Sequence, residues 1–404
     1  MFLMAQGTTT QVDWRKEFHE FEDVAYLNAA GQGPLPRAAL RAAQQALEWK
    51  KLPHLVPDEA YFGLPDRVRK SVAQLIGGRA EEVAITTGAS GGLAAVALGM
   101  AWNSENEVLI ARGEFPAHFS TWMPMATAGR LQLRVVEPGW TASSRHAADA
   151  RFLSAEDLLA AITPRTRLVS TSLVRFDDAT RIETRQLADA CHAVGAFLLL
   201  DVSQCAGAMP LDVAELGADF LVCAGYKWLL SPYGTGFFWV RRELIESREF
   251  GQPVPFYWMA LEGAERFHEL AMGTWRPTPD ARRWDAPETA SFFNLAAMEA
   301  SLEFLLRAGV RTIWAHNCRL TGEIIERLPR DRCVLASPVD PSARGPFVCA
   351  RARTPEKTRA LYEKLREARV VVSLRENALR IAPHLYNTER DLDRLLSILA
   401  VEGR

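Results

Sequence analysis

The chain has 404 residues, of which 48% are hydrophobic and 24% are charged, and its formal net charge is −2. This composition is typical of a globular protein with more than one domain. The near-neutral charge argues against a nucleic-acid partner, and the absence of an 18-residue apolar stretch argues against a transmembrane helix.

Seven short apolar runs, separated by longer helical patterns, occupy the first two thirds of the chain. They lie at residues 82–86, 107–112, 131–137, 166–174, 196–201, 218–224 and 236–240. Strands that are apolar throughout and alternate with helices are typical of a parallel sheet buried on both faces. The sequence therefore predicts an α/β fold with a large domain, in which helices flank a mostly parallel seven-stranded sheet.

The pattern changes after residue 240, where a long loop rich in aromatic residues, proline and arginine precedes a helical pattern at 294–327. Apolar runs then alternate with helical patterns at 354–368 and 388–401, which predicts a smaller C-terminal α+β domain. The expected division is an N-terminal arm at 1–25, a large domain at 26–285 and a small domain at 286–404.

The six cysteines have no CxxC spacing, so the sequence predicts neither a zinc site nor a redox-active pair. The first residues, MFLMAQGTTTQVDW, lack the basic region and the long apolar core of a signal peptide. We therefore expect a protein of the reducing cytoplasm that binds no metal.

Residues able to take part in binding or catalysis follow several of the predicted strands. Ligands of open parallel sheets bind at the carboxyl ends of the strands. The stretch TTGASGG, 86–92, joins a strand to a helix, where free N–H groups and the helix dipole favour an anion. Thr87 and Ser90 add hydroxyl groups. An ordinary capped turn is the alternative interpretation, and the stretch is neither a GxGxxG nor a Walker sequence.

Asp201 and Lys227 each follow an apolar strand, so the carboxylate and the amine are expected at the same edge of the sheet. A helix cap or a surface lysine would be the ordinary explanation. Burial lowers the pKa of a lysine, however, and a neutral amine is the nucleophile that Schiff-base chemistry requires. Gln204 is expected to face the same site.

A third strand end carries aromatic side chains, in the stretch EFPAHFSTW at 114–122. Phe115, His118 and Trp122 are candidates for stacking on a flat ring, with core packing as the alternative. An anion cradle, a carboxylate, a lysine and an aromatic face together fit pyridoxal 5'-phosphate. The acid would keep the pyridine nitrogen protonated, which makes the ring a stronger electron sink.

The stretches DVSQCAGAMPLDV, DFLVCAGYKWLLSPYGTGFFWV and LRIAPHLYNT resemble the class V aminotransferase family, within fold type I of the pyridoxal-phosphate enzymes. The resemblance covers nearly the whole chain and includes the spacing of 26 residues from Asp201 to Lys227. The family also contains cysteine desulfurases, kynureninases and isopenicillin N epimerase-like proteins.

The resemblance implies a role for each candidate residue. Lys227 would form the Schiff base and move the proton on the substrate α-carbon, and Asp201 would pair with the pyridine nitrogen. Four further residues would contact the cofactor: Gln204 at the ring hydroxyl or the lysine, Phe115 on the ring, and Ala89 and Ser90 at the phosphate.

Arg380 matches the arginine that binds the substrate carboxylate in this family, a task that suits the fork of a guanidinium group. Tyr226 stands where many members have a histidine, and the resemblance implies that it reaches the phosphate. The loop between VVVSLRE and NALRIAPH has no cysteine, which argues against a desulfurase that forms a persulfide.

These features imply a pyridoxal-phosphate enzyme that acts on an amino acid or amine, with a class V aminotransferase as the favoured activity. A kynureninase-like lyase or an isopenicillin N epimerase-like enzyme is the alternative. An inactive relative that acts as a binding protein is a further alternative, against which the presence of both Asp201 and Lys227 argues. The resemblance also implies a homodimer, with a small-molecule substrate and neither a nucleic-acid nor a membrane partner.

Overall fold

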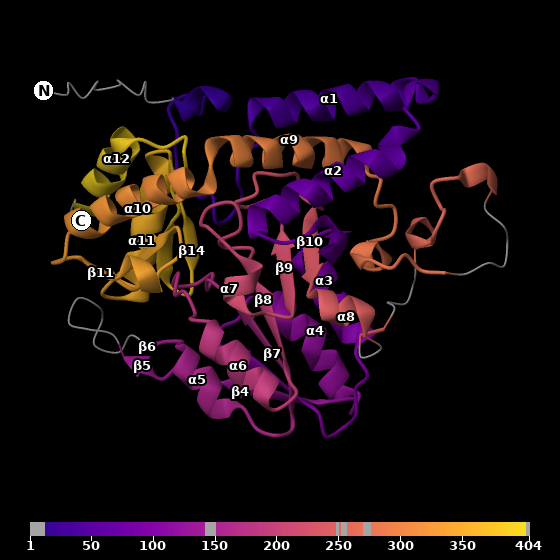
Figure 1. Ribbon diagram of the computed structural model, residues 1–404. Coiled ribbons are helices and arrows are strands. Elements are labelled where there is room, and N and C mark those ends of the chain that lie inside the picture. The colour runs from indigo at the N-terminus through magenta and orange to yellow at the C-terminus, as the bar shows by residue number, and fades with distance from the viewer. Residues whose placement is uncertain (1–12, 142–150, 248–249, 252–256, 270–275, 401–404) are drawn as a thin grey trace, which may run out of the picture.

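The computed structural model describes residues 13–141, 151–247, 250–251, 257–269 and 276–400. A large seven-stranded sheet forms the centre of the molecule, and the C-terminal elements gather beside it (Figure 1). Across the described residues, no helix is both long and apolar enough to cross a membrane.

The large sheet contains all seven predicted strands. Its spatial order is β2 (Val83–Thr86), β10 (Gly236–Val240), β9 (Phe220–Ala224), β8 (Phe197–Asp201), β7 (Thr166–Ser172), β3 (Glu107–Ala111) and β4 (Gln132–Val136). All neighbours are parallel except β10, which runs antiparallel to both β2 and β9. The prediction of a mostly parallel sheet is therefore confirmed.

Helices cover both faces of this sheet because alternate residues of its strands point in opposite directions. Leu221 of β9 packs in the core with α2 (Glu59–Ile76), α5 (Ala155–Ala161) and α6 (Arg185–Ala193). Its neighbour Val222 packs in the opposite core with α3 (Ala89–Gly99), α4 (Pro116–Thr127) and α8 (Arg242–Glu246). Burial on both faces explains why these strands are apolar throughout.

The smaller C-terminal unit has an antiparallel sheet. Its order is β11 (Cys333–Leu335), β12 (Val348–Ala352), β15 (Ala378–Ile381) and β14 (Ser373–Arg375). The helices α10 (Val310–Arg327), α11 (Pro355–Glu367) and α12 (Glu389–Ala400) contribute to the same apolar core. The predicted α+β composition of this region is confirmed.

The N-terminal segment joins the two units. β1 (Ala25–Tyr26) pairs in parallel with β13 (Val370–Val371) of the C-terminal unit. A few residues later, the backbone N–H of Gly33 donates to the carbonyl of Tyr226, 2.9 Å away, in the loop after β9. The segment therefore holds the C-terminal unit against the loop that carries Lys227.

Helix α9 (Phe292–Ala308) packs against both α1 (Arg37–Lys51) and α2 and lies between them (Figure 1). The aromatic ring of Phe304 on α9 meets that of Phe18 edge to face, with centroids 5.4 Å apart. Although α9 lies within the predicted small domain, it packs largely on helices of the large one. Short elements complete the fold: β5 (Trp140–Thr141), β6 (Arg151–Phe152) and α7 (Val213–Leu216).

Candidate active site

The carboxyl ends of β8 and β9 bring Asp201 and Lys227 to one edge of the sheet, as the sequence predicts. Both residues are buried, with 5% and 6% of their surfaces exposed. Burial lowers the pKa of the Lys227 amine to about 8, against the opposing effect of the Asp201 charge. About one tenth of Lys227 is therefore a free amine at pH 7, far more than for an ordinary lysine, and the free amine is the form that attacks an aldehyde.

The loop between β9 and β10, residues 225–235, fixes the position of Lys227. The backbone N–H of Leu230 donates to the Lys227 carbonyl over 3.1 Å, and Leu230 has a positive φ of 52°. Such a backbone is costly for a side chain of this kind. Ser301 of α9 stabilises this backbone conformation, because its hydroxyl donates to the Leu230 carbonyl over 2.7 Å.

Gly33 permits the N-terminal segment to lie directly on this loop. A Cβ atom at Gly33 would come within 2.1 Å of the Lys227 carbonyl oxygen, so only glycine fits here. The stretch GQGP therefore acts in packing around the lysine, a role that the sequence pattern did not reveal.

Aromatic rings surround the Lys227 amine. Its nitrogen lies 4.9 Å from the ring centre of Phe115 and 5.7 Å from that of Tyr226. Phe115 is held in turn by an edge-to-face contact with Phe176, at a centroid distance of 5.4 Å. A flat ring attached to Lys227 would therefore have an aromatic neighbour, which is the predicted role of Phe115.

The predicted anion cradle lies at the start of α3. Its N-cap is Gly88, with a φ of 147° that favours glycine, and the helix begins at Ala89 and Ser90. The first N–H groups of a helix have no acceptor within it, so they can bind a phosphate. Burial raises the pKa of Tyr226, which keeps its hydroxyl protonated and able to donate.

Arg380 on β15 belongs to the same site. It is 2% exposed, and its guanidinium donates to the carbonyl of Phe176 over 3.1 Å and to the hydroxyl of Ser373 over 3.4 Å. Burial lowers its pKa to about 10, so it remains a cation at neutral pH. Its Nε has no hydrogen-bond partner within the described residues, which leaves donor capacity for a carboxylate.

Gln204 is already engaged by the protein. Its amide donates to the carbonyl of Ala30 over 3.2 Å and accepts from the indole of Trp228 over 3.0 Å. These contacts fasten the N-terminal segment to the loop that carries Lys227. The contact of Gln204 with a cofactor remains a prediction.

Sequence analysis missed a buried cluster beside the site. Arg175 follows β7, is 3% exposed and lies 2.7 Å from the carboxylate of Asp177. Burial and the neighbouring Asp178 raise the pKa of Asp177 to about 7. Charged residues at the end of an apolar strand were the available signal, the same one that identified Asp201.

The edge of the sheet thus offers an amine, a carboxylate, an anion-binding helix terminus, an aromatic face and a free guanidinium N–H. This set fits pyridoxal phosphate, with Lys227 for its aldehyde, Asp201 for its ring nitrogen and the start of α3 for its phosphate. The structure, within the residues that it describes, has no group of three His, Cys, Asp or Glu side chains placed to hold a metal ion.

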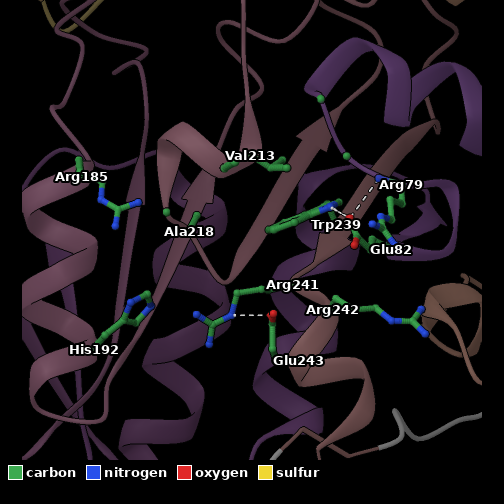
Figure 2. A pocket seen from close by; sticks show the side chains of 14 residues that line it. Arg79, Glu82, Arg185, His192, Val213, Ala218, Trp239, Arg241, Arg242 and Glu243 are labelled. Carbon is green, nitrogen blue, oxygen red and sulfur yellow. Dashed lines mark hydrogen bonds and ion pairs between the residues drawn. The ribbon is translucent and has the colours of Figure 1, made fainter.

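A separate pocket of about 410 Å³ lies at the opposite edge of the sheet, where Arg79, Arg185, Arg241 and Arg242 surround it (Figure 2). Two of the side chains that line it, Arg241 and His192, each lie 3.0 Å from the carboxylate of Asp219. This pocket lies at the amino ends of the parallel strands and takes no part in the site of Lys227.

The lowered pKa of Lys227 leads to a measurable pH dependence. The rate at which pyridoxal phosphate attaches to the apoprotein is expected to rise with pH and to level off above about 8. Below this pH the protonated amine has no lone pair for the aldehyde. A lysine with the ordinary pKa of 10.5 would continue to gain rate beyond pH 10. Stopped-flow absorbance across this range measures the rate, and Lys227→Ala provides the blank.

The family model described as Aminotransferase class-V matches residues 25–395. The isopenicillin N epimerase of Streptomyces clavuligerus is 28% identical over 389 residues, which cover 93% of this chain and 94% of the relative. A probable cysteine desulfurase of Streptomyces coelicolor is 29% identical over 78% of this chain and 73% of its own length.

The fold is similar to that of the cystine C–S lyase C-DES, solved in complex with its reaction product cysteine persulfide. The TM-score is 0.82 at 22% sequence identity, and the match covers 94% of this chain and 98% of that structure. The likeness confirms the fold.

Proposed function

Because the chain belongs to the class-V aminotransferase family, whose members use pyridoxal phosphate, we propose that it transfers the amino group of an α-amino acid or amine. The observation that carries this proposal is the convergence of three buried groups: the Lys227 amine, the Asp201 carboxylate and the Arg380 guanidinium.

Each group has a distinct task. Arg380 binds the substrate carboxylate and orients the α-carbon above the ring. Pyridoxal phosphate supplies an electron sink that stabilises negative charge on that carbon. Lys227 would take the proton from the substrate α-carbon and, in a transamination, would carry that proton as the base that completes the transfer. Asp201 holds a proton on the pyridine nitrogen throughout.

A lyase or epimerase is the second candidate, since the same proton abstraction begins elimination and epimerisation. The relatives named as an epimerase and as a probable desulfurase support it. Which bond breaks depends on how the substrate stands over the ring and on what then receives the proton.

The products distinguish these activities. The holoenzyme is incubated with a panel of amino acids in the absence of an amino-group acceptor. A transaminase yields one equivalent of 2-oxo acid per site and pyridoxamine phosphate. Continuous release of ammonia would instead indicate a lyase, and loss of optical purity without 2-oxo acid would indicate an epimerase.

We further propose that the protein is a homodimer. Tyr233 lies in the Lys227 loop, is 72% exposed, and its ring centroid lies 4.5 Å from that of Tyr226 in the site. A large exposed aromatic side chain at the mouth of a site suits burial against a second copy. Sedimentation of the purified enzyme tests this assembly.

Replacing Arg380 with leucine is expected to raise KM for an α-amino acid by about 10- to 100-fold, because a charge-assisted hydrogen bond contributes about 1.5–3 kcal/mol. An amine substrate without a carboxylate is expected to lose much less. Steady-state kinetics with an amino acid and its decarboxylated analogue measure the difference.

Arg375 supplies the matched control, because it lies on the neighbouring β14 and is exposed, and its guanidinium donates to the carbonyl of Leu374. Arg375→Ala is expected to leave KM within about threefold of the native value, in line with the small energies of exposed charges. A larger increase in KM for the Arg375 variant than for the Arg380 variant would show that Arg375 binds the substrate carboxylate.

The enzyme is expected to form no persulfide on its own cysteines. Cys349 is fully buried beside Arg380 on the adjacent strand, and burial raises the pKa of its thiol. A protonated buried thiol is a poor acceptor of sulfur. Mass spectrometry after incubation with cysteine provides the measurement. A gain of one sulfur atom that disappears in Cys349→Ala would contradict this expectation.

A further inference from the structure

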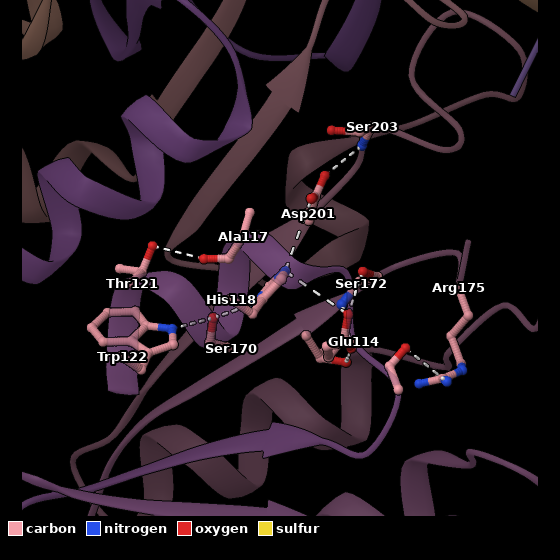
Figure 3. Close-up of polar contacts among 12 residues, drawn as sticks. Glu114, Ala117, His118, Thr121, Trp122, Ser170, Ser172, Arg175, Asp201 and Ser203 are labelled. Carbon is pink, nitrogen blue, oxygen red and sulfur yellow. Dashed lines mark hydrogen bonds and ion pairs between the residues drawn. The ribbon is translucent and has the colours of Figure 1, made fainter. Parts of the chain in front are cut away.

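A buried histidine lies behind Asp201, between two carboxylates (Figure 3). His118 is on α4, one turn after Phe115, and none of its surface is exposed. Its Nε2 lies 3.9 Å from Oδ2 of Asp201 and 3.9 Å from Oε2 of Glu114. The sequence left stacking or core packing open for His118; the structure buries the imidazole beside the carboxylate assigned to the ring nitrogen.

The other ring nitrogen of His118 has a defined partner. Its Nδ1 lies 2.9 Å from the hydroxyl oxygen of Ser170, and the indole N–H of Trp122 donates to that same oxygen over 3.1 Å. An indole can only donate, so the Ser170 oxygen accepts from Trp122, and its own hydrogen is free for Nδ1. In this arrangement Nδ1 accepts from Ser170, and Nε2 carries a proton that faces the two carboxylates.

The two carboxylates beside Nε2, Glu114 and Asp201, differ in the number of hydrogen bonds that they accept from the protein. Glu114 accepts three hydrogen bonds: from the hydroxyl of Thr171 over 2.7 Å, and from the N–H and the hydroxyl of Ser172 over 2.9 and 2.6 Å. Burial alone would raise the pKa of Glu114, but neighbouring groups, among them Arg175 and Ser172, outweigh it and lower the pKa. Glu114 therefore remains an anion that anchors the start of α4 to β7.

Asp201 accepts one hydrogen bond within the described residues, from the N–H of Ser203 to Oδ1 over 2.8 Å. His118 Nε2 is a buried polar atom without a hydrogen-bond partner there. An unpaired buried donor is costly, and an underused carboxylate oxygen lies within 4 Å of it. Contacts of this kind are commonly long in a ligand-free site and shorten when the ligand is bound.

We propose that His118 is a positioning residue for Asp201: Ser170 and Trp122 hold its imidazole with the proton on Nε2, from where it donates to Oδ2 of Asp201 and keeps that carboxylate aligned with the cofactor's ring nitrogen. The inference rests on the proposed function, because it assigns Asp201 to a pyridine ring. Oδ1 is held by Ser203, so the two donors together set the plane of the carboxylate.

Substitutions of His118 separate its two nitrogens. A glutamine amide can reach the place of Nε2, whereas an asparagine amide reaches only the place of Nδ1. His118→Gln is expected to keep kcat within about threefold, and His118→Asn and His118→Phe are expected to lower it by roughly 10- to 100-fold, as for a lost hydrogen bond to a charge. KM is expected to change little, since Arg380 holds the substrate.

The decisive readout is independent of turnover. Holoenzyme loaded with pyridoxal phosphate labelled with ¹⁵N in its ring reports protonation of that nitrogen by NMR. The native enzyme and His118→Gln are expected to show a protonated ring nitrogen, and the signals of His118→Asn and His118→Phe are expected to move toward the unprotonated position. Identical signals in all four proteins would overturn the proposal.

A second measurement needs no variant and no cofactor. In apoprotein labelled with ¹⁵N-histidine, Nε2 of His118 is expected to carry a proton and Nδ1 to accept one from Ser170, and Ser170→Ala is expected to release this preference. A native tautomer with the proton on Nδ1 would also overturn the proposal. If Lys227 still binds pyridoxal phosphate in that case, the proposed function stands and only the role of His118 fails.

Discussion

Replacing Lys227 with alanine is expected to lower kcat by at least about 10³-fold, because one substitution removes both the amine that binds the cofactor and the base that moves the proton. The large effect follows from the position of Lys227. It is buried, its pKa is lowered to about 8, and Asp201 and Arg380 lie around it. Rates with the substrate identified from the amino-acid panel provide the measurement.

Covalent attachment gives an independent measure of the same residue. Borohydride reduction of the native holoenzyme is expected to fix pyridoxal phosphate to the peptide that contains Lys227, and the alanine variant is expected to acquire no such mass. Lys70, an exposed lysine on α2, is the matched control, since Lys70→Ala leaves the site intact. Native turnover in Lys227→Ala would refute the assignment of the whole site.

Replacing Asp201 with asparagine is expected to slow proton abstraction by on the order of 10³-fold, since removing a preorganised charge from a buried site typically costs about 3–4 kcal/mol in the transition state. An amide cannot hold a proton on the pyridine nitrogen as a carboxylate does. The ring then becomes a weaker electron sink. Deuterium exchange at the substrate α-carbon measures this step separately from later ones.

Asp219 provides the control for Asp201, because it is also a buried carboxylate next to a strand of the same sheet. Its partners are structural: the N–H of Leu198 at 2.7 Å, and His192 and Arg241 at 3.0 Å. Asp219→Asn is expected to lower the melting temperature and to preserve kcat per folded enzyme. Equal loss of exchange in both variants would mean that Asp201 acts through stability alone.

The sequence was sufficient to locate the strands and the residues at their ends. A strand buried on both faces must be apolar along its whole length, so each run of the large sheet is visible locally. Polar residues such as Asp201 and Lys227 then stand out where an apolar strand ends. The predicted seven strands and the separate C-terminal α+β unit are confirmed for this reason.

The direction of β10 illustrates the limit of local patterns. An apolar run looks the same whether it is parallel or antiparallel to its neighbours. Its antiparallel course follows from the short connection at 225–235, because a parallel crossover usually needs a dozen or more residues and a helix. The connection that reverses the chain here is the loop that presents Lys227.

The sequence by itself determined the chemistry available at the sheet edge, because the type of each residue and its place after a strand are local properties. Only the tertiary structure decided how these residues are used. It placed His118 behind Asp201 and joined Gln204 to Ala30 and Trp228. It also packed Gly33 on the lysine loop. Each of these contacts links segments far apart in the chain, so their geometry depends on how the whole molecule packs.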